Sequence, residues 1–171
     1  MRFSVHGPFQ IPRHNGLVAR DAASRREFWE GIELAEEGLS EACGCYVFAV
    51  GKSAWYVGMA SKRTFEGECF APHKIMLYNE ILHELCGKPT LTLIAPRTPE
   101  KRFRKPSKNG HGSIDFLEDI LIGMGIRHNP ELLNIRGTKL LKTMNVPGIL
   151  NTGRGQGKRL AVRWLRKVLG A

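Results

Sequence analysis

The sequence lacks long hydrophobic runs and has no segment typical of protein export. None of its apolar stretches approaches the roughly 20 residues needed to cross a bilayer. The N-terminal Met-Arg-Phe-Ser-Val-His-Gly-Pro has no apolar core of a signal peptide. These absences argue against a membrane or secreted protein, so we expect a cytoplasmic chain with no membrane partner.

Closely spaced cysteine pairs are missing as well. The four cysteines are Cys43, Cys45, Cys69 and Cys86. No two of them form a Cys-x-x-Cys pair, which disfavours a zinc–thiolate site even if His73 or His83 were a further ligand. In a cytoplasmic protein we expect all four thiols to be reduced.

Acidic residues are absent from residues 136–171, which hold nine lysines and arginines. Residues 96–112 hold six cations and one acid, Glu100. The chain carries a net charge of +10, so these stretches, at +9 and +5, leave −4 for the rest. Such segregation favours a polyanionic partner, most simply DNA, with RNA also open. A basic surface that serves only solubility is the alternative. The cations expected to contact phosphate are Arg102, Arg104, Lys105, Lys158, Arg159, Arg163, Arg166 and Lys167.

The length and composition are those of one folded domain. With 171 residues, of which 42% are hydrophobic, the chain can bury a core. We expect a single domain over residues 1–171, with a basic C-terminal extension at 136–171.

Residues 45–50 and 54–57 form two β-rich runs separated by Gly51-Lys52-Ser53, a pattern typical of a β-hairpin. Side chains alternate between the faces of a strand, so Tyr46 and Tyr56 can share one face. The alternative is that both tyrosines simply fill the sheet surface, where aromatic residues are common.

The periodicity of hydrophobic residues, together with the residues that typically begin or end helices and strands, predicts the remaining elements. Residues 3–13 alternate but contain Pro8 and Pro12, which favours an edge strand or an extended arm. Helices are expected at 24–38, capped by Ser24, at 72–86, at 114–127, capped by Ser113, and at 138–144. A strand is expected at 90–95, and the connecting segments are 59–71, the loop 96–112 and the glycine-rich link 151–157. The chain is expected to close with a basic helix at 158–169, in which Trp164, Leu165 and Val168 face inward.

Glu118 occupies an unusual place in the helix expected at 114–127. At about 100° per residue it falls inside the apolar stripe, between Ile114 and Ile122, whereas Asp119 lies on the polar flank. A carboxylate in a core-facing stripe is costly unless it is paired or binds a cation. A glutamate that reaches solvent at the stripe edge is the alternative.

Four pieces of residues 43–135 resemble the GIY-YIG nuclease family. Gly44-Cys45-Tyr46 resembles the first signature, and Tyr56-Val57-Gly58 resembles the second at the usual spacing. Glu118 resembles the metal-binding glutamate of the late helix, and Asn134 resembles the downstream asparagine. The resemblance implies an α+β fold in which helices flank a small three-stranded antiparallel sheet, with an N-terminal arm and helix and a basic C-terminal helix added.

One family feature is displaced. The family has an arginine in or near the first turn of the helix after the second signature, often with a histidine one turn later. Here that position holds Glu66. Arg63 comes earlier, and Lys74, next to His73, comes later in the first turn of the expected helix. Either cation can be the counterpart.

The resemblance implies hydrolysis of DNA phosphodiester bonds with Mg²⁺ or Mn²⁺ bound by Glu118. In that chemistry Tyr46 or Tyr56 helps to activate water, and Lys74 or Arg63 balances charge on the phosphate. We therefore expect a divalent-metal-dependent DNA endonuclease. One alternative is a nucleic-acid-binding protein that keeps this fold and has lost cleavage. Another is an RNA-binding or ribosome-associated protein.

Overall fold

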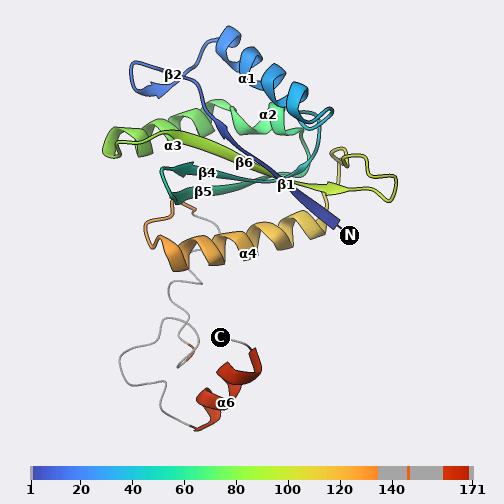
Figure 1. Cartoon of the computed structure of the whole chain (residues 1–171), viewed down its shortest axis with the longest axis vertical. Coiled ribbons are helices and arrows are strands. Elements are labelled where there is room, and N and C mark those ends of the chain that lie inside the picture. The colour runs from blue at the N-terminus through green and yellow to red at the C-terminus, as the bar shows by residue number, and fades with distance from the viewer. Residues whose placement is uncertain (1, 135–145, 147–159, 170–171) are drawn as a thin grey trace. The chain divides into compact units, whose positions relative to one another are not determined.

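The computed structural model describes residues 2–134, 146 and 160–169 (Figure 1). The chain divides into two compact units, Met1–Leu133 and Asn134–Ala171, whose placement relative to each other is not determined. Nothing in the structure tests the domain limits expected from the sequence, which stay predictions.

The first unit is built on a four-stranded antiparallel sheet in the order β1-β6-β4-β5. Its strands are β1 (Arg2–Gln10), β4 (Gly44–Val50), β5 (Ser53–Ala60) and β6 (Pro89–Arg97). A small hairpin, β2 (Arg13–His14) and β3 (Leu17–Val18), follows β1. The hairpin and the α+β class are confirmed, but the expectation of three strands is wrong.

The fourth strand is β1, the segment expected to be an edge strand or an arm. It pairs with β6 from Arg2 opposite Arg97 to Gln10 opposite Thr90. Pro8 does not prevent this pairing because the register shifts between His6 and Phe9, which leaves the proline out of the ladder. A strand at the edge of a sheet also forms hydrogen bonds with a neighbour on one side only, so it tolerates a proline better than a central strand does.

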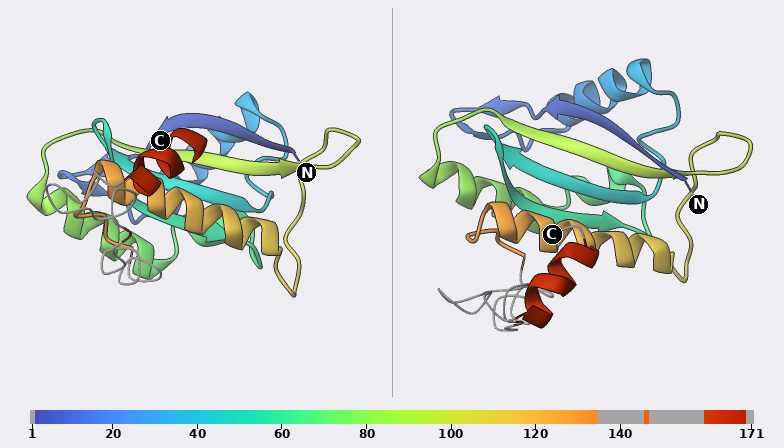
Figure 2. Two further views of the ribbon diagram at one scale, coloured as in Figure 1. Left: turned by 90° about the horizontal axis from the view of Figure 1, so that it is seen from below. Right: turned by 60° about the horizontal axis from the view of Figure 1, so that its bottom comes forward.

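Four helices complete this unit: α1 (Ala22–Ala35), α2 (Phe65–Cys69), α3 (Pro72–Glu84) and α4 (Gly112–His128). Figures 1 and 2 show α1, α2 and α3 on one face of the sheet and α4 on the other. Alternate residues of β4 supply both cores. Tyr46 and Phe48 belong to the larger core on the α1–α3 face, while Cys45 and Val47 pack with Ile114 of α4.

Two helix starts differ from the sequence prediction because other side chains cap them. Asp21 caps α1 by accepting a hydrogen bond from the Ser24 N–H at 2.8 Å, so Ser24 lies inside the first turn. Thr64 caps α2 by accepting from the Gly67 N–H, within a segment expected to be an irregular connection. A helix as short as α2, with five residues, shows too little hydrophobic periodicity to be predicted from the sequence.

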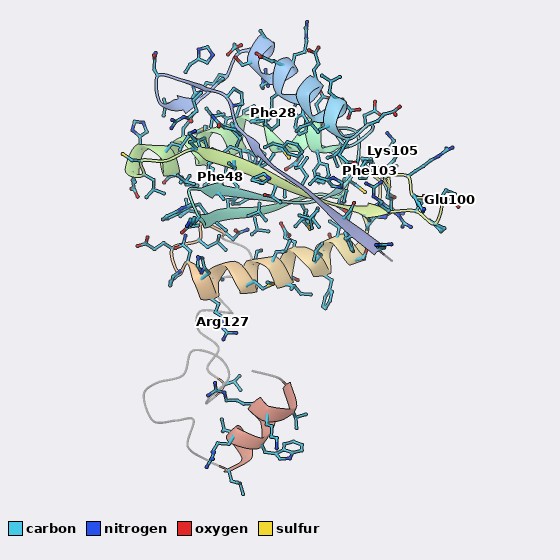
Figure 3. The ribbon with its side chains drawn as sticks, viewed as in Figure 1. Phe28, Phe48, Glu100, Phe103, Lys105 and Arg127 are labelled. Atoms are coloured by element: carbon cyan, nitrogen blue, oxygen red, sulfur yellow. The ribbon has the colours of Figure 1, made fainter. Side chains whose placement is uncertain are left out.

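The basic segment after β6 is more ordered than the expected loop at 96–112. Arg97 and Phe103 form an isolated antiparallel bridge, so residues 97–103 make a hairpin. In Figure 3, Glu100 lies toward the outer end of this hairpin and Phe103 nearer the sheet. The following helix begins at Gly112, and His111 occupies its N-cap without a side-chain hydrogen bond, so the cap expected from Ser113 is not formed.

The described part of the second unit contains one helix, α6 (Leu160–Leu169). Trp164 is 64% exposed, and Leu165 and Val168 are also exposed, so the described residues do not bury the face of α6 that was expected to point inward. No second described element of this unit is present to cover them. The short helix expected at 138–144 and the link at 151–157 lie outside the described residues. Across the ranges that the structure describes, no helix is long and apolar enough to span a bilayer.

Candidate functional site

Tyr46 and Tyr56 lie on the same face of the β4–β5 hairpin. In the register of this hairpin Tyr46 is opposite Gly58 and Tyr56 is opposite Phe48. The two tyrosine ring centroids are 6.2 Å apart. This arrangement follows from strand alternation, as the sequence predicts.

The signature glycines are required by close packing. A Cβ on Gly58 would lie 2.4 Å from the ring of Tyr46, and a Cβ on Gly44 would lie 2.1 Å from the carbonyl oxygen of Ile94. Neither contact is sterically allowed. Gly58 is therefore fixed by its packing against Tyr46 and Gly44 by the close approach of β6, which accounts for the two glycines without any catalytic role.

Tyr46 is fully buried, and its hydroxyl has no regular hydrogen-bond partner. Burial raises its pKa well above the ordinary value, with smaller contributions from the neighbouring Tyr78 and other groups. Tyr46 is thus a neutral phenol at physiological pH and is not suited to act as a base. Of the two signature tyrosines, only Tyr56 is partly exposed.

Lys74 reaches Tyr56 from the first turn of α3. Its ammonium group donates a hydrogen bond to the Tyr56 hydroxyl oxygen and lies 4.4 Å from the centre of the Tyr56 ring. The same ammonium is 4.0 Å from a carboxylate oxygen of Glu68 on α2. The side chains of Lys74 and Glu68 are only 12% and 19% exposed, so the electrostatic interaction is screened less than at an open surface.

A hollow of about 220 Å³ opens at the C-terminal end of β5. Its lining includes Glu68 from α2, Asp115 from α4, and Arg63 from the connection between β5 and α2. Groups from both faces of the sheet therefore meet there. Arg63 is exposed, in contrast to the largely buried Lys74.

Glu118 lies one turn after Asp115 on α4, the helix on the face opposite Tyr46. It is 9% exposed, between the buried Ile114 and Ile122, so its predicted place inside the apolar stripe is confirmed. Burial raises the pKa of the Cys45 thiol, and the charges of Glu118 and Asp115 raise it further. Both carboxylates therefore lie near Cys45, beneath β4.

The donor set fits a magnesium ion rather than zinc. No three His, Cys, Asp or Glu side chains of the described residues gather closely enough to form a metal cluster. Mg²⁺, however, is often held by one or two carboxylates, with water and substrate phosphate as its other ligands. Asp115 and Glu118, three residues apart on one helix, offer two such carboxylates.

Two other predicted site residues are not brought to this cluster by any described contact. His73 is exposed at the start of α3 and makes none of the contacts described for Lys74. Asn134 is buried, but it begins the second unit, so it is not positioned relative to the hollow. Glu68 and Asp115 were missed by sequence reasoning. Thr64, a residue type that often caps helices, could have revealed α2 and with it Glu68. Asp115 could have been found because it lies three residues before Glu118 on the same helix.

The cations expected to contact nucleic acid lie in different settings. Arg102 is exposed, Arg104 is half-buried, and Lys105 forms an ion pair with Glu41. Three more are exposed on α6: Arg163, Arg166 and Lys167. Lys158 and Arg159 lie outside the described residues.

Comparisons of the chain with protein-family models, with curated proteins and with solved structures found no significant match.

Proposed function

We propose that this protein is a divalent-metal-dependent endonuclease that hydrolyses phosphodiester bonds of DNA. The observation that carries the proposal is the contact of Lys74 with Tyr56 and Glu68 beside the hollow lined by Arg63 and Asp115. Glu68 both lines this hollow and pairs with Lys74, so cations, a phenol and carboxylates border the C-terminal end of β5, a set that suits a phosphate substrate and a divalent ion.

Each group has a role that its surroundings allow. Tyr56, which accepts a hydrogen bond from Lys74, is the phenol placed to orient the attacking water. Lys74 offsets negative charge at the reacting phosphate, while the exposed Arg63 holds the phosphate at the rim of the hollow. Tyr46 supports the site from below by filling the space next to Gly58.

Glu118 and Asp115 are the residues that would hold Mg²⁺ or Mn²⁺. When bound, such an ion polarises the phosphate and stabilises the leaving oxygen. The basic hairpin and the acid-free stretch 136–171 supply the non-specific attraction to the DNA backbone.

A nucleic-acid-binding protein without cleavage is the second candidate. It is favoured by Glu66, an exposed acid at the position where the resembling family has its arginine. Lys74, moreover, already interacts with Tyr56 and Glu68, which reduces its availability to a substrate.

The test is nicking of a supercoiled plasmid by the purified chain with Mg²⁺, Mn²⁺ or a chelator. Metal-dependent nicking supports the endonuclease, and DNA binding without nicking under every metal supports the second candidate. A structured RNA of similar length is tested in parallel. Tight binding to RNA alone, without cleavage, would exclude the endonuclease and would restrict the second candidate to an RNA-binding protein.

A further inference from the structure

A second polar cluster lies at the opposite edge of the sheet. The Nε2 atom of His6 is 2.8 Å from the hydroxyl oxygen of Ser4, and its Nδ1 atom is 3.3 Å from a carboxylate oxygen of Glu36. A hydroxyl, an imidazole and a carboxylate are thus joined through the two nitrogens of one ring. This is the order of contacts by which serine hydrolases activate their nucleophile.

Arg97 completes the cluster from β6. Its Nε–H donates to the Ser4 hydroxyl oxygen at 3.0 Å, and a terminal nitrogen lies 3.4 Å from the second carboxylate oxygen of Glu36. A guanidinium on the hydroxyl oxygen favours negative charge there. The Ser4 hydroxyl has one other acceptor in reach, the Ala95 carbonyl oxygen at 3.4 Å, which is farther than His6.

The backbone explains how these groups meet. Ser4 and His6 are two residues apart on β1 and so point to the same face of the strand, and the bulge follows directly after His6. Glu36 occupies the C-cap of α1, where a carboxylate is disfavoured by the helix dipole. Its contacts with His6 and Arg97 offset that cost.

His6 is held firmly, whereas Ser4 opens into a cavity. His6 is 8% exposed, and the ring of Phe103, labelled in Figure 3, packs edge-on against its imidazole with the ring centroids 5.3 Å apart.

Ser4 lines a hollow of about 960 Å³. Four cations share this lining: Arg2, Arg97, Lys101 and Arg104. Arg2 and Arg97 are directly opposite each other in the ladder, a like-charge pair that a bound anion would stabilise.

We propose that Ser4, His6 and Glu36 form an esterase site for small carboxylic esters that carry an anionic group. Ser4 is the nucleophile, His6 the general base and Glu36 the group that orients the imidazole. The other three cations of the lining, Arg2, Lys101 and Arg104, bind the anionic end of the ester. Strands β6 and β4 separate this edge from β5, so the site is independent of the proposed nuclease.

The reaction balances without a cofactor. The Ser4 oxygen attacks the ester carbon while its proton passes to Nε2 of His6. The C–O bond to the alcohol then breaks, and the alcohol leaves with that proton. Water next attacks the acyl-serine, again giving its proton to His6, and the acid departs as Ser4 recovers its proton. The Arg97 guanidinium, which donates to the Ser4 oxygen, is the described group that would offset the negative charge formed beside that oxygen.

Covalent labelling of the full chain tests the nucleophile. The chain is treated at pH 8 with a fluorophosphonate probe, digested and examined by mass spectrometry. We expect the adduct on Ser4, its loss in Ser4→Ala, and labelling at least about 100-fold slower in His6→Gln. Ser53→Ala, a serine at the start of β5, should label at the wild-type rate. Circular dichroism checks that each variant is folded.

Ester hydrolysis tests the substrate class. Mono-4-nitrophenyl glutarate should be hydrolysed at least about 10-fold more efficiently than 4-nitrophenyl acetate, and Arg2→Gln should reduce that preference. The absence of an adduct on Ser4 in the folded wild type, or an adduct formed equally fast in His6→Gln, would overturn the esterase site. Equal efficiency towards the two esters would overturn the anionic substrate.

Discussion

The two edge strands of the sheet, β1 and β5, border different chemistry although they share one core. At the β5 edge, Tyr56, Lys74 and Glu68 come from a strand and two helices, and no histidine of the described residues lines the hollow. At the β1 edge, Ser4 and His6 are neighbours on one strand and meet Glu36.

The difference teaches what each edge is suited to do. A neutral imidazole can take and return a proton near pH 7, which favours covalent catalysis at a hydroxyl. Lysine and carboxylates without an imidazole instead suit a phosphate whose charge is balanced by a cation and a metal ion. Substitutions that affect one edge alone should therefore separate the two proposed activities.

The largest effect is expected from Glu118→Gln. This change keeps the shape of the side chain but removes the charge that would attract a divalent ion, so plasmid cleavage should fall by at least about 100-fold. Labelling of Ser4 at the other edge should stay unchanged. Asp119→Asn, at an exposed position of the same helix, is the control and should cut DNA at the wild-type rate. Normal cleavage by Glu118→Gln would remove this residue from the mechanism.

The next comparison is between the two cations of the β5 edge. Lys74→Ala removes the partner of both Tyr56 and Glu68, and we expect single-turnover cleavage to fall by about 10-fold to 100-fold. Arg63→Ala should mainly weaken DNA binding, because Arg63 is exposed at the rim of the hollow. The opposite ranking of the two cleavage rates would assign the catalytic cation to Arg63.

A third prediction concerns the stability of the β5 edge. Gly58→Ala forces a methyl group against the ring of Tyr46 and should lower the free energy of unfolding by about 3 kcal/mol. Gly31→Ala is the matched control, since no atom lies within 4 Å of the added Cβ in the interior of α1. It should be neutral or stabilise by about 0.5–1 kcal/mol. Urea unfolding measures both, and equal effects would mean that Tyr46 is not packed against Gly58.

The smallest effect is expected beside the β1 edge, at Glu33. Burial raises the pKa of this carboxyl, but hydrogen bonds from Ser40 and Gly38 lower it more, so the net shift is downward from 4.5. Stability from this group is therefore present above pH 4.5 and is lost as the pH falls through the lower pKa of the folded state.

Glu33→Gln should reduce the free energy of unfolding by about 1 kcal/mol at pH 7. The difference from wild type should shrink at pH 3. Glu30→Gln, at an exposed position of the same helix, is the control. A difference that does not change with pH would show that the charge of Glu33 is not involved.

Local periodicity made part of the molecule predictable. The alternation of strands places Tyr46 and Tyr56 on one face, and the 100° rotation of a helix places Glu118 inside an apolar stripe. Pro72 marks the start of α3, which places Lys74 in its first turn. These features depend on the backbone geometry of a single element, so the sequence alone determined them.

The contacts between elements were decided only by the tertiary structure. Tyr56 and Lys74 are 18 residues apart, and Ser4 and Arg97 are 93 apart. Whether such side chains meet depends on which strands pair, in what register, and where a helix packs on the sheet. The joining of β1 as a fourth strand is of this kind, because its edge position and bulge accommodate Pro8 through pairing with a distant β6. The sequence shows which reactive side chains are present. Which of them meet at the two edges of the sheet depends on how the whole unit packs.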